Sequence, residues 1–286
     1  MIFKKMFPVS LLILSCFFFA VLAALIKYLS EQIHPFEQAF FRNFISILII
    51  YPFILKYKIK ISKKENLKLL LLRGGFGGIT MILLFWSYSL IPLSQAMAIS
   101  FTTPLFMYLG SIIFFKEKIL KINTTAIILG FILTIILIRP DLELKFGVLI
   151  ALIASLTHTV AGLLVKQISK TESVLLLMFS MVLLMAPISF LPSLYVWTNP
   201  DSLEIIILLI VIAGVATIGN FLWTKALSKG TLTNLMPFEF SKLLFATILG
   251  ILFFNEELDF ITIFCGISLL FLNHYLAKSL RKNEKT

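Results

Sequence analysis

The sequence predicts an all-α integral membrane protein, with ten transmembrane helices arranged as two inverted five-helix repeats and both termini in the cytoplasm. Three observations predict this fold: an apolar composition, an uneven distribution of lysines among the loops, and an internal repeat. Of the 286 residues, 59% are hydrophobic and 14% are charged, and the mean hydropathy is +1.03. A water-soluble domain of this size needs more polar surface than such a composition supplies.

Long apolar runs fill most of the chain. A helix needs about 20 predominantly apolar residues to cross a ~30 Å hydrocarbon core. Runs that meet this requirement lie at about 8–29, 36–55, 67–90, 93–115, 122–138, 146–166, 173–195, 203–227, 231–254 and 258–277. The first run follows Lys4 and Lys5 but is too long for a signal-peptide core, so we expect an uncleaved helix there. Cys16 and Cys265 fall inside apolar runs, where small buried thiols are expected.

Basic residues gather in alternate loops. The loop after the second run, "KYKIKISKKENLK", holds six lysines. The other loops of this side and the chain ends contribute Lys116, Lys118, Lys121, Lys166, Lys170, Lys225 and Lys229, with Lys4, Lys5, Lys278, Arg281, Lys282 and Lys285. The loops of the opposite side hold only Arg139 and Lys145. The positive-inside rule then places both termini in the cytoplasm, and we expect a multi-pass protein of the bacterial inner membrane.

The two halves of the chain resemble each other. "FWSYSLIPLSQAMAISFTTPLFMYLGSIIFFKEKI" in the first half matches "FLWTKALSKGTLTNLMPFEFSKLLFATILGILFFNEEL" in the second, so that Trp86 corresponds to Trp223. We therefore expect one five-helix repeat at residues 1–140 and another at 141–286. Because five is odd, the second copy enters the membrane inverted. Inverted repeats place a shared site near the bilayer midplane, where the two copies face each other.

Glu239 and Lys242 interrupt the ninth apolar run. At a rise of about 1.5 Å per residue, Lys242 lies roughly 16 Å into the membrane, close to the midplane. Residues at i and i+3 share a helix face, so one interpretation is a mutually neutralised pair that only packs. The other is a polar site facing a cavity, suited to a zwitterion, because ionisable residues at this depth are costly and usually functional. Pro237, just before them, removes a backbone donor and frees nearby carbonyls, as broken helices at binding sites do.

Three further basic residues lie within or near apolar runs. Lys27 is close enough to the outer end of its helix to extend to the headgroups. Arg42 and Arg73 lie deeper, and we weigh structural anchoring between helices against a position facing the bundle interior. Next to Arg73, Gly74 and Gly78 form a G-x-x-x-G pattern, which predicts close approach of a neighbouring helix.

Several other side chains are candidates for lining the cavity. Asn220 and Thr102 are polar groups within predicted helices. His158 lies near the middle of the sixth helix, where it either packs or couples transport to protons. Aromatic rings can stack on a planar ligand, although packing is the common role of any one of them, and Trp86 and Trp223 also fit interfacial belts. The candidate substrate-binding residues are Glu239, Lys242, Phe238, Asn220, Thr102, Tyr88, Trp86, Phe101 and His158.

Motifs for other functions are missing from the sequence. It has no G-x-x-x-x-G-K-[ST], H-E-x-x-H, C-x-x-C or G-x-S-x-G. We therefore expect no enzyme, no cofactor, no metal site and no ATP motor of the P-loop kind. A secondary carrier is the leading interpretation; a membrane-embedded lipid-modifying enzyme and a channel are the alternatives. Counterflow separates a carrier from a pore, because trans substrate accelerates uptake only by a carrier.

The chain resembles the drug/metabolite transporter superfamily in its EamA-type ten-helix branch. The resemblance extends over nearly the whole chain and is carried by the order of "FFRN" (Phe40–Asn43), "LLRGGFGG" (Leu71–Gly78), the repeat segment containing "FTTPLF", "LGFILTIILIRP" (Leu129–Pro140) and "MPFEFSKLLFATILGILFFNEEL". It implies a central cavity lined by the fourth and ninth helices with others of both halves. Family members often have an aromatic and a small or polar residue where this chain has Phe240 and Ser241.

The resemblance also suggests a substrate. Lysine outnumbers arginine and Phe, Ile and Leu dominate, which suits the AT-rich genome of a reduced intracellular bacterium. EamA-type carriers of such bacteria include S-adenosylmethionine uptake proteins, to which this chain is similar in length and in its second-half segment. We expect S-adenosylmethionine uptake, with export of amino acids or related metabolites as the alternative. The expected partners are a small-molecule metabolite and the lipid bilayer, with no nucleic acid, in a monomer or homodimer.

Overall fold

The computed structural model describes residues 3–61, 64–91, 99–138, 146–254 and 260–282, and within these ranges all regular structure is helical. In chain order the helices are α1 (Phe3–Leu29), α2 (Pro35–Lys56), α3 (Lys64–Leu90), α5 (Thr102–Phe115), α6 (Lys121–Ile138), α7 (Phe146–Ile168), α8 (Val174–Ser193), α9 (Leu203–Lys229), α10 (Leu232–Leu235), the 3-10 helix η1 (Met236–Phe240), α11 (Ser241–Phe254) and α12 (Phe260–Lys282).

The described helices account for the ten predicted spans. Eight segments are long and apolar enough to cross a membrane, one of them being the segment Leu232–Phe254 that α10, η1 and α11 form together. Two apolar helices are shorter, Thr102–Phe115 and Lys121–Ile136. The prediction of an all-helical membrane protein is confirmed.

Polar side chains begin three of the helices. Ser173 accepts a hydrogen bond from the backbone N–H of Leu176 at the start of α8, and Ser202 does the same for Ile205 at the start of α9. These N-caps satisfy backbone donors that have no partner inside the helix. At the start of α2, Nδ1 of His34 accepts from the N–H of Phe36 over 3.2 Å.

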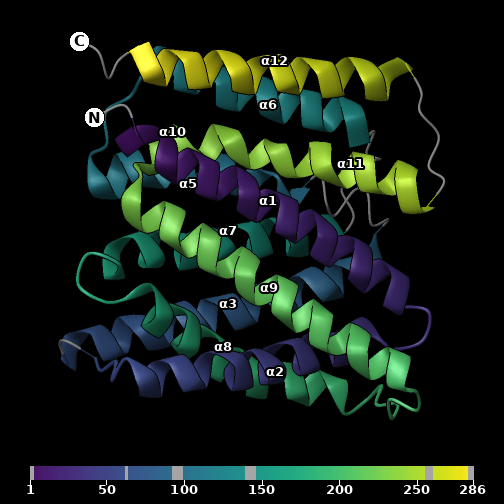
Figure 1. Ribbon diagram of the computed structural model, residues 1–286. Coiled ribbons are helices and arrows are strands. Elements are labelled where there is room, and N and C mark those ends of the chain that lie inside the picture. The colour runs from purple at the N-terminus through teal and green to yellow at the C-terminus, as the bar shows by residue number, and fades with distance from the viewer. Residues whose placement is uncertain (1–2, 62–63, 92–98, 139–145, 255–259, 283–286) are drawn as a thin grey trace.

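The long helices lie side by side, and their ends face two opposite sides of the bundle (Figure 1). The start of α1, the end of α12, the turn from α7 to α8 and the turn from α9 to α10 lie together on the left of the view. Lys166, Lys170, Lys225 and Lys229 belong to these helix ends and turns. The basic segments named here therefore lie at one end of the bundle, together with both terminal helix ends.

Each half of the chain packs against the other rather than folding alone. Helix α3 packs along α7 and α8, while α1 packs along α9 and α11. Helix α2 packs along α8 and α9, α5 packs on α7, and α6 packs on α12. Most helix pairs that contact each other therefore join the first half to the second.

The G-x-x-x-G pattern of α3 lies where α8 approaches. A Cβ atom added to Gly74 would lie 2.4 Å from Cδ1 of Leu184, and one added to Gly78 would lie 2.5 Å from Cδ1 of Ile188. Only hydrogen atoms fit in the space that these contacts leave. The predicted close approach is confirmed, with α8 as the neighbouring helix.

The largest buried cluster surrounds the interrupted ninth span. Phe238 and Phe240 of η1 are both 0% exposed. They belong to a cluster that also contains side chains from α1, α5, α6, α7, α8, α9 and α12, among them Leu12, Met107, Ile127, Val165, Leu177, Leu227 and Leu269. The two residues that flank Glu239 in the chain are therefore anchored in the packed core.

Candidate substrate-binding site

The ninth span is broken in the middle of the bundle. Helix α10 ends at Leu235, the 3-10 helix η1 covers Met236–Phe240, and α11 begins at Ser241. Pro237 stands in the first turn of η1, where its missing N–H prevents a regular α-helical ladder. A 3-10 turn in the middle of a span often marks a functional position. The interruption expected at Pro237 is present.

Cys16 of α1 lies against the carbonyls of this break. Its sulfur is 3.8 Å from the carbonyl oxygen of Glu239 and 4.0 Å from that of Phe238, with the thiol as donor. The thiol is 0% exposed. Cys16 is thus more than a small apolar residue, because it partners backbone acceptors that the 3-10 geometry leaves weakly bonded.

The Glu239 carboxylate is held from α9. Its Oε1 accepts a hydrogen bond from Nε1 of Trp223 over 2.7 Å, and the Glu239 side chain is 9% exposed. A short hydrogen bond from a neutral donor offsets part of the cost of burying a carboxylate, but it leaves the charge itself without a counter-ion. Trp223 is 9% exposed as well.

Lys242 points to a different neighbour. Its Nζ lies 5.2 Å from the centre of the Phe101 ring. Phe101 is 3% exposed and stacks on Phe240, with ring centres 6.0 Å apart. The ammonium is half-buried over the face of an aromatic ring, an arrangement that attracts a cation.

Glu239 and Lys242 do not form an ion pair with each other. Both residues are described, and the contacts of their charged atoms are those with Trp223 and Phe101. The carboxylate is directed to α9 by its hydrogen bond to Trp223, whereas the ammonium lies over the Phe101 ring at the start of α5. The two side chains therefore make no direct ion pair, although the Lys242 charge still acts on the Glu239 carboxylate.

His158 borders space inside the bundle. The exposed apolar residues of α7 recur every three or four positions and are Phe146, Leu149, Ile153, Leu156 and Val160. His158 is exposed too, but it lies on the opposite side of the helix, among buried Ala151, Ala154, Ser155, Gly162 and Val165. Its ring centre is 6.1 Å from that of Trp223. The accessible surface of His158 therefore faces an internal space next to the Trp223–Glu239 pair.

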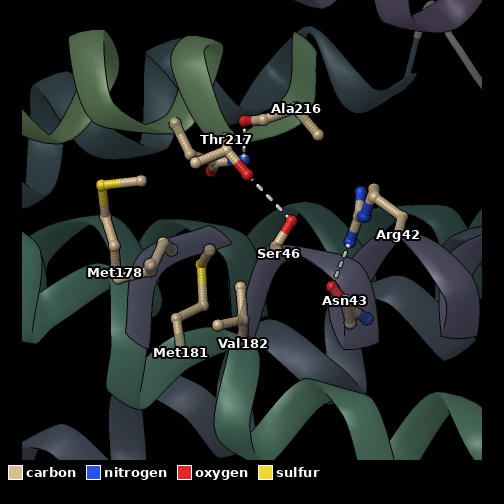
Figure 2. Close-up of a pocket in the computed structure, with 10 residues that line it drawn as sticks. Arg42, Asn43, Ser46, Met178, Met181, Val182, Ala216 and Thr217 are labelled. Atoms are coloured by element: carbon tan, nitrogen blue, oxygen red, sulfur yellow. Dashed lines mark hydrogen bonds between the residues drawn. The ribbon is translucent and has the colours of Figure 1, made fainter. Parts of the chain in front are cut away.

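Asn220 lines a small cavity one helical turn from Trp223. The cavity lies between α2, α8 and α9 (Figure 2) and has a volume of about 10 Å³, room for roughly one water molecule. Its polar lining comes from Arg42, Asn43 and Ser46 of α2 and from Thr217 and Asn220 of α9. Its apolar lining is Ile50, Met178, Met181, Val182 and Ala216.

Hydrogen bonds fix several of these polar groups. Oγ1 of Thr217 donates to Oγ of Ser46 over 2.9 Å, and Nη2 of Arg42 donates to Oδ1 of Asn43 over 3.1 Å (Figure 2). Nδ2 of Asn220 donates to the carbonyl of Ala216 over 2.8 Å. Arg42 therefore has a partner on its own helix, and its side chain lines the cavity.

The remaining predicted site residues have different surroundings. Phe238 is 0% exposed and belongs to the packed core. Thr102 begins α5 and donates to the carbonyl of Ile99 over 2.6 Å. Trp86 is 47% exposed and meets Phe146 edge to face at 6.0 Å, in keeping with an interfacial position. Tyr88 lies on α3, and its side chain is outside the described part of the structure.

The structure thus brings Glu239, Lys242, Phe101 and His158 close to Trp223 or Phe240. The sequence indicated Trp223 only as a stacking or interfacial aromatic, and it left Arg42 between a structural anchor and a position facing the bundle interior. The polar spacing of Arg42, Asn43 and Ser46 on α2 is a signal that would have indicated the cavity of Figure 2.

A known family has this sequence pattern. The profile of the EamA-like transporter family matches residues 6–139 and again residues 145–277. The chain belongs to the EamA-like transporter family. It is therefore a transporter and not an enzyme. One solved crystal structure superposes on 97% of this chain and 99% of its own with a TM-score of 0.81 at 15% identity, which shows a shared fold.

Curated relatives of this EamA-like transporter carry substrate names. It is 29% identical to an S-adenosylmethionine uptake transporter of Rickettsia bellii (strain RML369-C) over 82% of this chain and 80% of the relative. It is 26% identical to that of Rickettsia prowazekii (strain Madrid E) over 90% of this chain and 87% of the relative. A pseudopaline exporter, CntI, of Pseudomonas aeruginosa (strain UCBPP-PA14) is 25% identical over 91% of this chain and 92% of the relative.

Proposed function

We propose that this EamA-like transporter takes up S-adenosylmethionine across the bacterial inner membrane, possessing a single central site that opens alternately to the two sides. The family and the rickettsial relatives support the class of substrate. One observation carries the proposal: Glu239 and Lys242 stand in the middle of a span, and neither is the partner of the other.

The substrate has groups that complement this site. S-adenosylmethionine carries a sulfonium, an ammonium, a carboxylate and an adenine ring. The cationic groups would lie toward the Glu239 carboxylate, and the carboxylate toward the Lys242 ammonium. Rings of Trp223, Phe101 and His158 are close enough to these charges to stack on adenine. Exchange for S-adenosylhomocysteine, which lacks the sulfonium charge, is a natural mode for such a site.

An inverted repeat would supply the two states. In chain order, α1, α3 and α5 of the first half correspond to α7, α9 and α11 of the second. The contact between α3 and α7 then corresponds to the contact between α9 and α1, and the contact between α5 and α7 corresponds to that between α11 and α1. The α6–α12 and α2–α8 pairs exchange with themselves. Helix α5 begins just after a turn at Phe101, and the corresponding span is broken at η1. This pseudo-symmetry supports rocking of one half against the other around a fixed site.

Uptake by proteoliposomes tests the proposal. The purified protein is reconstituted and offered radiolabelled S-adenosylmethionine and a metabolite panel, with and without a pH gradient. We expect saturable S-adenosylmethionine uptake that unlabelled substrate on the trans side accelerates. Absence of uptake in both vesicle orientations, with uptake of another panel member, would reject this substrate.

Two variants test the site within the same assay. Glu239→Gln and Lys242→Met should each abolish transport while the protein still inserts, because each removes one charge that the zwitterion needs. Lys225→Met is the matched control, since Lys225 stands over Phe221 toward the end of α9. Normal uptake kinetics in both site variants would exclude a binding role.

Export of an amino acid or related metabolite is the second candidate. The pseudopaline exporter of Pseudomonas aeruginosa is the observation that favours it. Other zwitterionic metabolites present the same pair of charges to Glu239 and Lys242. The site alone therefore does not distinguish uptake of S-adenosylmethionine from export of another metabolite. Uptake into inside-out rather than right-side-out vesicles, driven by a gradient, is the result that export predicts.

A further inference from the structure

Arg73 is a buried cation with unused donors. Its side chain is 3% exposed, and its Nε and Nη1 have no hydrogen-bond partner. Arg42, the other arginine of the described spans, donates to Asn43 and to the sulfur of Met81. A guanidinium has five N–H donors in a rigid fork, and burying it without an acceptor is strongly unfavourable.

Arg73 points into the bundle rather than toward lipid. The exposed apolar residues of α3 gather on one side of the helix and are Leu67, Leu71, Leu72, Ile79, Trp86 and Leu90. Arg73 lies on the other side, two turns before Thr80 and in line with it. Oγ1 of Thr80 lies 2.8 Å from Oγ1 of Thr157 on α7, the residue next to His158. The face of α3 that carries Thr80 and Arg73 therefore lies toward α7, with Thr80 at the level of His158 and Arg73 about 10 Å nearer the start of α3.

Arg73 and Lys242 both act on the internal space beside His158. Both residues lie close enough to His158 for their positive charges to act on its ring. His158 is exposed to the internal space, whereas the Arg73 side chain is buried. An anionic group beside His158 would lie in the field of cations from α3 and from α11.

We propose that Arg73 binds the carboxylate of the transported solute, as a second cation opposite Lys242. This inference rests on the proposed function, because it assigns a group of the substrate to the same site. A carboxylate matches the planar fork of a guanidinium with two parallel hydrogen bonds. A lipid phosphate is disfavoured as the ligand, since Arg73 faces away from the exposed side of α3.

Pairs of solutes with and without a carboxylate test the assignment. Uptake and competition are measured for S-adenosylmethionine against decarboxylated S-adenosylmethionine, and for methionine against 3-(methylthio)propylamine. For at least one pair, we expect the wild type to take up the compound with the carboxylate at least tenfold better than its decarboxylated counterpart. Arg73→Met should reduce this preference to about twofold or less, and Arg73→Lys should restore part of it. Equal preference in the wild type and in Arg73→Met would overturn the assignment.

Thermal stability gives a readout that does not depend on transport. Removing an unpartnered buried charge should leave the melting temperature of the ligand-free, detergent-solubilised protein unchanged or higher in Arg73→Met. The stabilisation that an acid solute gives the wild type should disappear in this variant. A lower melting temperature with an unchanged ligand shift would identify Arg73 as a structural anchor. If inorganic phosphate raises the melting temperature of the wild type and no carboxylic acid does so, a carboxylate is rejected as the ligand of Arg73.

The two proposals fail separately. A wild type that carries another carboxylic acid but not S-adenosylmethionine, with discrimination lost in Arg73→Met, rejects the substrate and keeps the role of Arg73. Uptake of S-adenosylmethionine with the same preference for the acid in the wild type and in Arg73→Met keeps the substrate and rejects the role of Arg73. A wild type that binds no carboxylate-bearing member of the panel rejects both.

Discussion

The indole N–H of Trp223 donates to Oε1 of Glu239 over 2.7 Å, joining α9 to the 3-10 turn of the ninth span. This bond fixes the direction of the carboxylate, and Cys16 holds the backbone carbonyl of the same residue from α1. Glu239 is thus oriented from two helices of opposite halves of the chain. No cation makes a direct ion pair with this carboxylate among the described residues, and Lys242 acts on it only through its field.

Replacing Trp223 by Phe tests this orientation. The variant keeps an aromatic ring but removes the donor, so a buried carboxylate loses a bond worth about 1.5–3 kcal/mol. We expect Vmax/KM for the transported solute to fall roughly tenfold or more. Trp197→Phe is the control, because Trp197 donates to Asn199 in an exposed loop. Equal kinetics for the two variants, at equal amounts in the membrane, would argue against the role of Trp223.

Gly130 of α6 lies against the ring of Phe240. An added Cβ would lie 2.5 Å from Cδ2 and 2.8 Å from Cε2 of that ring. Gly130→Ala must therefore displace Phe240, which stacks on Phe101 beneath Lys242. Overpacking of this kind costs about 1–3 kcal/mol, and we expect lower thermal stability in detergent together with weaker substrate binding.

Gly214→Ala is the matched control for this prediction. Gly214 lies inside α9, and no side chain or neighbouring helix comes within 4 Å of a Cβ atom added to it. Alanine is the better helix former by about 1 kcal/mol, so this variant should melt at the same or a higher temperature. Similar melting curves for both alanine variants would show that Phe240 can move without cost.

Glu117 closes the turn between α9 and α10. Its Oε2 accepts from the N–H and the hydroxyl of Thr233 over 2.8 and 3.0 Å, and its Oε1 accepts from the N–H of Leu232 over 3.1 Å. Lys166 binds the carbonyls of Leu227 and Gly230 in the same turn. In Glu117→Gln only one acceptor oxygen remains, and the charge is lost.

Hydrogen exchange should detect this loss. Charge-assisted bonds contribute about 1.5–3 kcal/mol, so the amides of Leu232 and Thr233 should exchange roughly tenfold faster in Glu117→Gln. Glu204→Gln, at the exposed start of α9, is the control and should leave this turn unchanged. Unchanged protection in Glu117→Gln would mean that packing alone holds the turn closed.

Thiol labelling checks the orientation in the membrane. Asn199 and Lys58 are exposed in loops that the lysine distribution assigns to opposite sides. Asn199→Cys should react with an impermeant maleimide in intact spheroplasts, whereas Lys58→Cys should react only after permeabilisation. Both native cysteines are buried, so the label reports the introduced thiol. The reverse pattern would place the termini outside.

The spans, their number and the break in the ninth one were predictable because each depends on local chemistry. A hydrophobic run of sufficient length must be helical in a bilayer, since no other local structure satisfies its backbone. Pro237 lacks the N–H that a regular helix needs. Gly74 and Gly78 predicted a close helix neighbour, because the lack of a side chain is itself visible in the sequence. Membership of the EamA-like family also followed from the order of motifs along the chain.

The partners of the charged residues were not predictable in the same way. Glu239 meets Trp223, 16 residues earlier, and Cys16, 223 residues earlier, while Lys242 turns to Phe101 of α5 rather than to Glu239. Helical periodicity tells which face a residue occupies, but it does not tell which other helix covers that face. The inner position of His158 and the unused donors of Arg73 emerged only when the two halves were packed together, because burial and hydrogen bonding between distant helices depend on how the helices cross.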